Sequence, residues 1–265
     1  LVGSEMCIRD RATTAEGSPE LMHAVFTAVS AICITGLSTV DTQTYWTPFG
    51  HVVIMGLIQV GGFGIVTVAS FLTLVATGRI SLQGSLLAGQ ELHQKNLSDT
   101  LRLPARIAGV MLAVEAVTAA VLSLSFVRYT NDWGKAVWHG IFHSVSAFNN
   151  AGFALYSDNL MGFVGDPTII VPICVAIILG GIGFPVVFEL ARNGRRRGAS
   201  YWSAHTRLTI YGTAALLVLG TLGFAILEWN NPSTLGPMPL GDKLLGALAG
   251  GVFPRTAGFN SINYG

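Results

Sequence analysis

Charged side chains are scarce in this 265-residue chain, which has 15 Lys and Arg and 14 Asp and Glu, 11% of its residues. Soluble domains carry about 25%. Hydrophobic residues make up 51% of the chain, so the composition excludes a disordered protein and argues strongly against a soluble globular one. The net charge of +1 gives no electrostatic basis for binding nucleic acid.

Cysteine is also rare: Cys7, Cys33 and Cys174 form no CxxC pair and no metal-ligand spacing. Cys33 and Cys174 stand among apolar residues, so we predict that both are small buried hydrophobic side chains. His139 and His143 are four residues apart on one helical face, but the sequence offers no third ligand for zinc. We therefore expect no resident metal ion.

Charge is missing altogether from several long windows, the longest being the 37 residues between Asp41 and Arg79. A helix crosses the hydrocarbon core of a membrane with about 20 mostly apolar residues. The windows predict spanning helices at about 46–76, 106–128, 167–190 and 207–229. Glu115, the one acid away from the ends of these helices, is a candidate intramembrane polar site, with a hydrogen-bonded packing role as the alternative.

Two further charge-free windows, 21–40 and 136–157, have only about a dozen apolar residues before small and polar residues follow. A 12-residue helix rises about 18 Å, roughly half of a bilayer. These windows predict half-helices that enter the membrane, turn and leave on the same side. Non-helical backbone at that depth must lie inside protein or against water.

An internal repeat connects the half-helices. Ser30–Leu37 (SAICITGL) recurs 116 residues later as Ser146–Phe153 (SAFNNAGF), and a third copy includes Pro254–Asn260 (PRTAGFN). A Gly-Gly-x-Gly segment follows the first two copies, at Gly61 and Gly180. Each unit is predicted to be a spanning helix, a half-helix, a glycine-containing loop and a second spanning helix, as in repeat-built transporters.

Basic residues are concentrated on one side of this topology, which indicates that this side is cytoplasmic. The half-helices therefore enter from outside, where most of the acidic residues lie. Glycine allows backbone angles that let a loop direct several carbonyl oxygens at one axis, and rings of carbonyls replace the hydration shell of K⁺. Nine basic residues lie on the cytoplasmic side against three on the other: Arg79, Lys95, Arg102, Arg106, Arg192, Arg195, Arg196, Arg197 and Arg207, against Arg128, Lys135 and Lys243.

The three loop sequences resemble the filter loops of the Trk/Ktr/HKT family of potassium transporters, and the Gly-Gly-x-Gly segments resemble the second spanning helices of its bacterial Ktr-type membrane subunits. The resemblance covers about residues 18–265. It implies an all-α polytopic membrane protein with repeated helix–pore-loop–helix units around a pseudo-fourfold pore, of which this chain carries a part. It assigns ion binding to three residues of each loop: Ile34, Thr35 and Gly36; Asn150, Ala151 and Gly152; Thr256, Ala257 and Gly258.

The expected organisation follows from these assignments. Residues 1–11 read as a non-native tail, residues 12–77 as the pore loop and second helix of unit one, and residues 78–105 as a cytoplasmic connection. Unit two occupies 106–190, a basic cytoplasmic loop 191–206, and the incomplete unit three 207–265. We expect that a pathway made from three loops alone does not conduct.

The resemblance implies K⁺ uptake through backbone carbonyls, with no covalently bound cofactor. It also implies a homodimer in the bacterial plasma membrane, surrounded by lipid and controlled by a cytoplasmic nucleotide-binding subunit. One alternative is a Na⁺ transporter or channel of the same family, and another is a carrier with a single midplane site. A distant alternative is an intramembrane enzyme, which would need a nucleophile with a base, paired acids or a metal cluster. The sequence offers only Glu115 and scattered histidines, so we predict no enzymatic activity.

Overall fold

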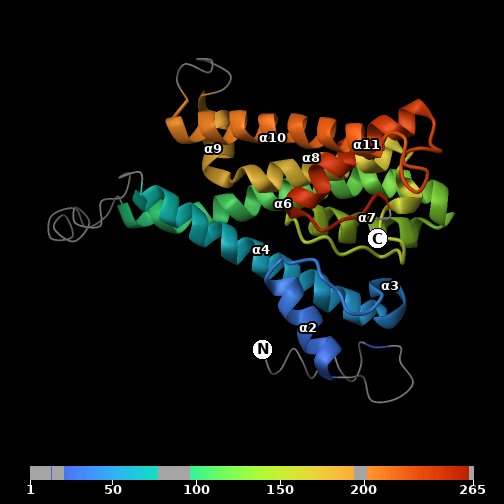
Figure 1. Cartoon of the computed structure of the whole chain (residues 1–265). Coiled ribbons are helices and arrows are strands. Elements are labelled where there is room, and N and C mark those ends of the chain that lie inside the picture. Colours follow the sequence, from blue (N-terminus) through green and yellow to red (C-terminus); the bar gives the residue numbers. More distant parts are fainter. Residues whose placement is uncertain (1–12, 14–20, 77–95, 194–201, 263–265) are drawn as a thin grey trace.

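The computed structural model describes residues 13, 21–76, 96–193 and 202–262, which form helices joined by loops (Figure 1). The expected tail at 1–11, most of the connection at 78–105 and most of the basic loop at 191–206 lie outside the described residues. The side chains of residues 65–76, 96–104, 192–193 and 256 lie outside them too.

Three of the four predicted spanning helices are continuous. They are α4 (Pro48–Ala76), α6 (Asn96–Thr130) and α10 (Ala204–Glu228). Within the described residues, 105–130 and 204–228 are each long and apolar enough to cross a membrane, and a bent pair formed by α8 and α9 could make a third crossing. The protein is therefore all-α in its described part, as predicted from the charge-free windows.

The prediction of one spanning helix over 167–190 is wrong. The chain forms α8 (Pro167–Ile182), breaks at Gly183 and continues as α9 (Phe184–Asn193), bent by 97°. Gly183 has φ of +87°, which ends the helix because that conformation is left-handed. Pro185, two residues later, lacks the N–H that a continuing helix needs. The helix breaks because of these two residues, and the apolar composition of the window did not reveal this break.

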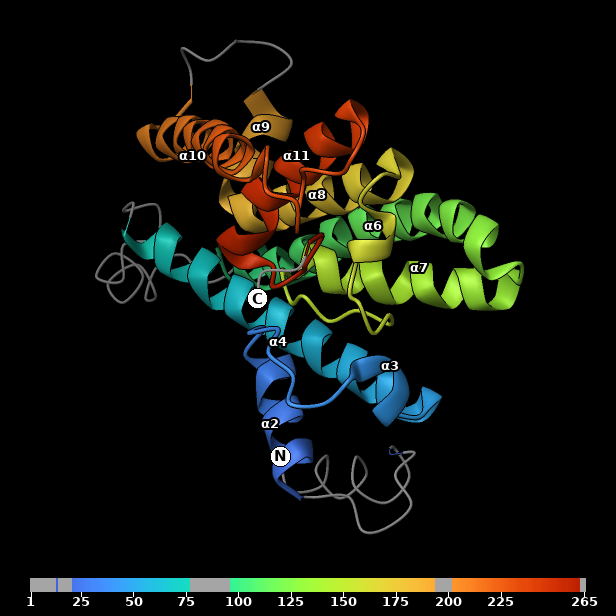
Figure 2. The same ribbon diagram turned by 45° about the vertical axis from the view of Figure 1, so that its right-hand side comes forward.

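Three half-helices are present as α2 (Leu21–Ile32), α7 (Trp133–Phe148) and α11 (Leu240–Thr256). In each case a loop follows that turns toward the centre of the molecule (Figure 2). α2 packs against α4, α7 against α6 and α8, and α11 against α10 and α8. The third half-helix is longer than expected, because Thr256, placed in the loop from the sequence, is the last residue of α11.

Polar residues start the helices at defined points. The Asp132 side chain accepts hydrogen bonds from the N–H groups of Gly134 and Lys135 at the start of α7. Asp166 caps α8 through the N–H of Thr168, and Ser203 caps α10. Such caps satisfy N–H groups that have no partner inside the helix. Asp41 does the same for the short helix α3 (Thr42–Tyr45), and the 3₁₀ helix η1 (Met161–Phe163) precedes α8.

Residues of the loops that follow α7 and α11 are buried within the hydrophobic cores. One core joins α6, α7, α8 and α11 and includes Phe253 and Phe259, and another joins α2 and α4 to the second loop through Ala151 and Phe153. Cys174 is buried as predicted. Cys33 is exposed, so the prediction for it is wrong: it stands at the end of α2, where apolar neighbours in sequence do not provide cover in space.

Candidate functional site: three converging glycine loops

The first and second loops follow the same backbone path. The Thr35 N–H donates to the Ser30 carbonyl at 2.9 Å, and at the equivalent positions the Ala151 N–H donates to the Ser146 carbonyl at 2.8 Å. Ile34 and Asn150 have φ of +56° and +59°, and the glycines that follow them have +77° and +76°. The sequence repeat is thus a repeat of conformation, including a left-handed residue that few side chains adopt without strain.

The glycines of the three loops meet. A Cβ atom built on Gly36 would lie 2.4 Å from the Ala151 carbonyl oxygen, and one on Gly152 would lie 2.2 Å from that of Ala257. A Cβ on Gly258 would lie 3.5 Å from the Cα atoms of both Gly36 and Gly152. The backbones approach so closely that side chains are excluded from this point. Of the predicted loop residues, the structure brings together Gly36, Ala151, Gly152, Ala257 and Gly258. Thr256 ends α11 instead of lying in the loop.

The half-helices direct their C-terminal ends at these loops. The last residues of α2 and α7, Ile32 and Phe148, are each four residues before a converging glycine. A helix C-terminus carries partial negative charge, so such ends favour a nearby cation.

The second helices pack directly on these half-helix ends. A Cβ on Gly61 of α4 would lie 2.0 Å from the Ile32 carbonyl oxygen, and a Cβ on Gly180 of α8 would lie 1.8 Å from that of Phe148. The first glycine of each Gly-Gly-x-Gly segment is needed because nothing larger fits against these carbonyls.

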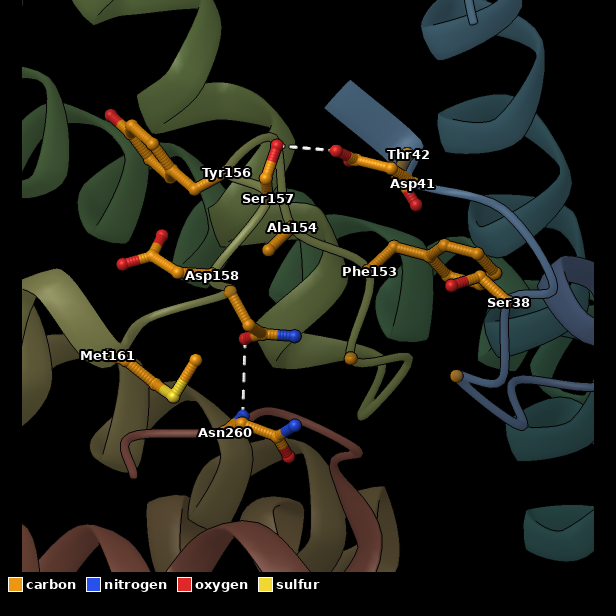
Figure 3. A pocket seen from close by; sticks show the side chains of 13 residues that line it. Ser38, Asp41, Thr42, Phe153, Ala154, Tyr156, Ser157, Asp158, Met161 and Asn260 are labelled. Carbon is orange, nitrogen blue, oxygen red and sulfur yellow. Dashed lines mark hydrogen bonds between the residues drawn. The ribbon is translucent and has the colours of Figure 1, made fainter. Parts of the chain in front are cut away.

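A cavity of about 220 Å³ lies against the loops, with Gly36 and Gly152 in its wall (Figure 3). Asp41 and Asp158 line it, and Asn260 of the third loop closes one side. The Asn260 N–H donates to the Asn159 side chain at 3.2 Å, which ties the third loop to the second. All three loops therefore contribute to one polar vestibule that contains acidic residues.

Asp41 joins the first loop to the second. Its side chain accepts a short hydrogen bond from the Ser157 hydroxyl, visible in Figure 3, while the Gln43 side chain accepts from the Ser157 N–H at 2.9 Å. Burial alone would raise the pKa of Asp41, but the hydrogen bonds from Ser157, Gln43 and Thr44 outweigh it and hold the pKa below the usual 3.8. The carboxylate is thus ionised at neutral pH and adds negative charge to the vestibule.

His143 supports the second loop. Its Nδ1 lies 2.8 Å from the His139 carbonyl, and its Nε2 accepts from the Leu155 N–H at 3.3 Å. Because the first bond needs a proton on Nδ1 and the second needs a free Nε2, this arrangement selects the neutral tautomer. The spacing of His139 and His143 is visible in the sequence. The contact between His143 and Leu155 is not, because it depends on how the chain turns between residues 143 and 155.

The remaining candidates lie away from the glycines. Asn150 holds its own loop by donating from its side chain to the Phe148 carbonyl at 3.3 Å. Glu115 is 5% exposed and lies behind the second loop, hydrogen-bonded to Gln59 and Asn149. In the part of the chain that the structure describes, no group of three or more His, Cys, Asp or Glu side chains is placed to hold a metal ion.

The sequence is similar to known cation transport proteins. Residues 4–265 match the model of the TrkH family, described as cation transport proteins. The chain is 41% identical over 244 residues to the Ktr system potassium uptake protein B of Bacillus subtilis and 39% identical over 243 residues to that of Vibrio alginolyticus. It is also 32% identical over 247 residues to the potassium/sodium uptake protein NtpJ of Enterococcus hirae.

These alignments include 92–93% of this chain but only 53–54% of each relative, so the chain spans about half the length of the curated relatives it matches. The family match covers nearly all of the chain, and the apolar helices fit a membrane protein. The chain therefore belongs to the TrkH family of cation transport proteins.

Proposed function

We propose that the complete protein takes up K⁺ across the membrane along the axis where the three glycine loops meet. One observation carries the proposal: the Ala151 and Ala257 carbonyl oxygens each lie against the converging glycine of a neighbouring loop, where no side chain fits. Carbonyl oxygens at close quarters can replace the hydration shell of K⁺. The ion-binding residues proposed from the sequence are those of the three loops, 34–36, 150–152 and 256–258.

The surroundings of the loops favour a cation over an anion. The C-terminal ends of α2 and α7 contribute partial negative charge from within the protein. The ionised Asp41 lies in the vestibule next to Gly36 and Gly152, where it raises the local concentration of cations. This proposal assigns the protein no enzymatic activity.

We propose the wider arrangement from the resemblance of the loops and the distribution of charge in the sequence. It comprises a homodimer in the bacterial plasma membrane and a cytoplasmic nucleotide-binding regulatory subunit. The vestibule faces outside, because Lys and Arg are concentrated at the opposite ends of the spanning helices.

Growth rescue tests the proposal. The complete gene that encodes this chain is expressed, with its regulatory subunit, in a bacterium that lacks its own K⁺ uptake systems. Growth on low K⁺ that is lost on changing Gly152 is the expected result. Protein that reaches the membrane in normal amount and does not restore growth would contradict K⁺ uptake. Measuring ²²Na⁺ uptake in the same cells tests the second candidate, Na⁺ transport, which the similarity to the potassium/sodium protein NtpJ favours.

A further inference from the structure

A buried polar cluster joins three helices behind the second loop. Glu115 of α6 accepts hydrogen bonds at both carboxyl oxygens: from the Gln59 Nε2 of α4 at 3.0 Å and from the Asn149 Nδ2 at the end of α7 at 3.0 Å. The Asn149 Nδ2 also lies 3.3 Å from the Gln59 Oε1, which closes a triangle of side chains. The cluster thus connects unit one, through α4, with both helices that begin unit two.

Asn149 is the member that reaches the loop. It caps α7 and directly precedes Asn150, the left-handed residue that starts the second loop. Its side chain is also pressed against α4, since a Cβ on Gly62 would lie 1.7 Å from the Asn149 Oδ1. The Asn149 Nδ2 donates to the Val145 carbonyl of α7 at 2.9 Å as well as to Glu115. Glu115 and α7 together therefore position a residue that lies three positions before Gly152.

The boundary between units two and three is built like the boundary between units one and two, but a different side chain lies at the contact. The offset of 106 that places Gly152 on Gly258 also places Asn149 on Arg255. A Cβ on Gly181 of α8 would lie 3.4 Å from the Arg255 Nη2, as Gly62 meets Asn149. At both boundaries the side chain at the base of a loop lies against a glycine of the preceding unit. The carboxyl group of Glu115 belongs to the first of these boundaries.

We propose that Glu115 is a positioning residue for the second loop: it fixes Asn149, and through it the Ala151 carbonyl beside Gly36, so that the loop discriminates K⁺ from Na⁺. This proposal rests on the K⁺ pathway proposed above. A carboxylate suits the role because each of its two oxygens accepts a hydrogen bond from one amide donor, Gln59 or Asn149. A glutamine at position 115 has only one acceptor oxygen, so its own NH₂ group would face one of these two donors. An unsatisfied buried donor is costly, so the loop would shift to relieve it.

The experiment compares K⁺ and Na⁺ uptake by the complete protein with its regulatory subunit, after correcting for the amount in the membrane. Glu115→Gln is expected to lower the K⁺-over-Na⁺ ratio by about tenfold, the change that corresponds to about 1.4 kcal/mol. The matched control is Ser125→Ala on the same helix, which removes a partly buried hydrogen bond from α6 to the Thr168 carbonyl of α8, away from the loop. Its ratio is expected to stay unchanged.

Asn149→Leu provides a second variant, because it removes the donor that links Glu115 to the loop. If Glu115 acts through Asn149, the double variant has about the same ratio as the more affected single variant, a non-additivity typical of coupled residues. Normal membrane abundance of Glu115→Gln with an unchanged ratio would overturn the inference, and so would additive effects. Failure of both single variants to reach the membrane would also overturn it, since the cluster would then serve assembly. Failure of the unmodified protein to take up K⁺ would instead refute the proposed function.

Discussion

Replacing Gly152 by alanine adds one methyl group at the point where the second and third loops touch. The new Cβ would lie 2.2 Å from the Ala257 carbonyl oxygen and 2.7 Å from the Gly258 backbone. Both neighbours are backbone atoms, so no side chain can rotate away. Gly152 also has φ of +76°, a conformation that costs a residue with a side chain about 1–2 kcal/mol.

The size of the effect follows from the contact distance. An ordinary contact of a Cβ atom starts near 3.4 Å, so the Ala257 carbonyl must move by about 1 Å to admit the methyl group. A displacement of about 1 Å at a site that depends on positioned groups costs on the order of 100-fold in rate. We expect Gly152→Ala to lower K⁺ uptake at limiting K⁺ by about this factor and to weaken its preference for K⁺ over Na⁺.

The assay is initial uptake of ⁸⁶Rb⁺ and ²²Na⁺ by cells that express the complete protein, with membrane abundance measured by immunoblot. Gly56→Ala is the matched control, because a Cβ on Gly56 of α4 meets nothing within 4 Å. Alanine also favours a helix over glycine by about 1 kcal/mol, so this control should fold at least as well as the unmodified protein. Gly152→Ala at normal abundance with unchanged uptake and selectivity would show that the convergence of the loops is not the ion pathway.

Three further substitutions test separate parts of the structure. Gly180→Ala places a Cβ 1.8 Å from the Phe148 carbonyl oxygen, so we expect the melting temperature of the purified protein to fall by several degrees; an unchanged melting curve would refute the packing of α8 on α7. Gly183→Ala meets only Pro185, at 3.8 Å, so its cost should be limited to the left-handed φ, about 1–2 kcal/mol of unfolding free energy by denaturant titration, and a stabilised variant would contradict the bend. The pKa of Asp41 is lowered in the folded protein, so its stabilising link to Ser157 should be complete above about pH 4 and be lost as the pH falls further. Titration of Asp41 should therefore cause no change in uptake between about pH 8 and pH 5 outside the cell. Asp41→Asn should lower uptake across that whole range. If uptake depends on external pH in this range and Asp41→Asn abolishes that dependence, the pKa of Asp41 is not lowered.

The spacing of charged and glycine residues was enough to predict most of the architecture. Charge-free windows predicted α4, α6 and α10 because crossing hydrocarbon excludes charge over a length that any span must have. The repeat predicted which glycines take equivalent places, and the structure confirms that Gly36 and Gly152 share one conformation. Composition could not predict the break at Gly183, because an apolar window looks the same whether its helix is straight or bent.

The sequence by itself determined that this is a repeated, membrane-embedded helical protein with glycine loops, since hydropathy and the conformational freedom of glycine are local properties. Only the tertiary structure decided which groups meet: that Gly61 contacts the end of α2 and Gly62 the side chain of Asn149, and that Glu115 lies 34 residues before its Asn149 partner in sequence but within hydrogen-bonding distance in space. Those contacts depend on how helices from different units cross, and a pattern along one helix carries no record of the helix that packs against it.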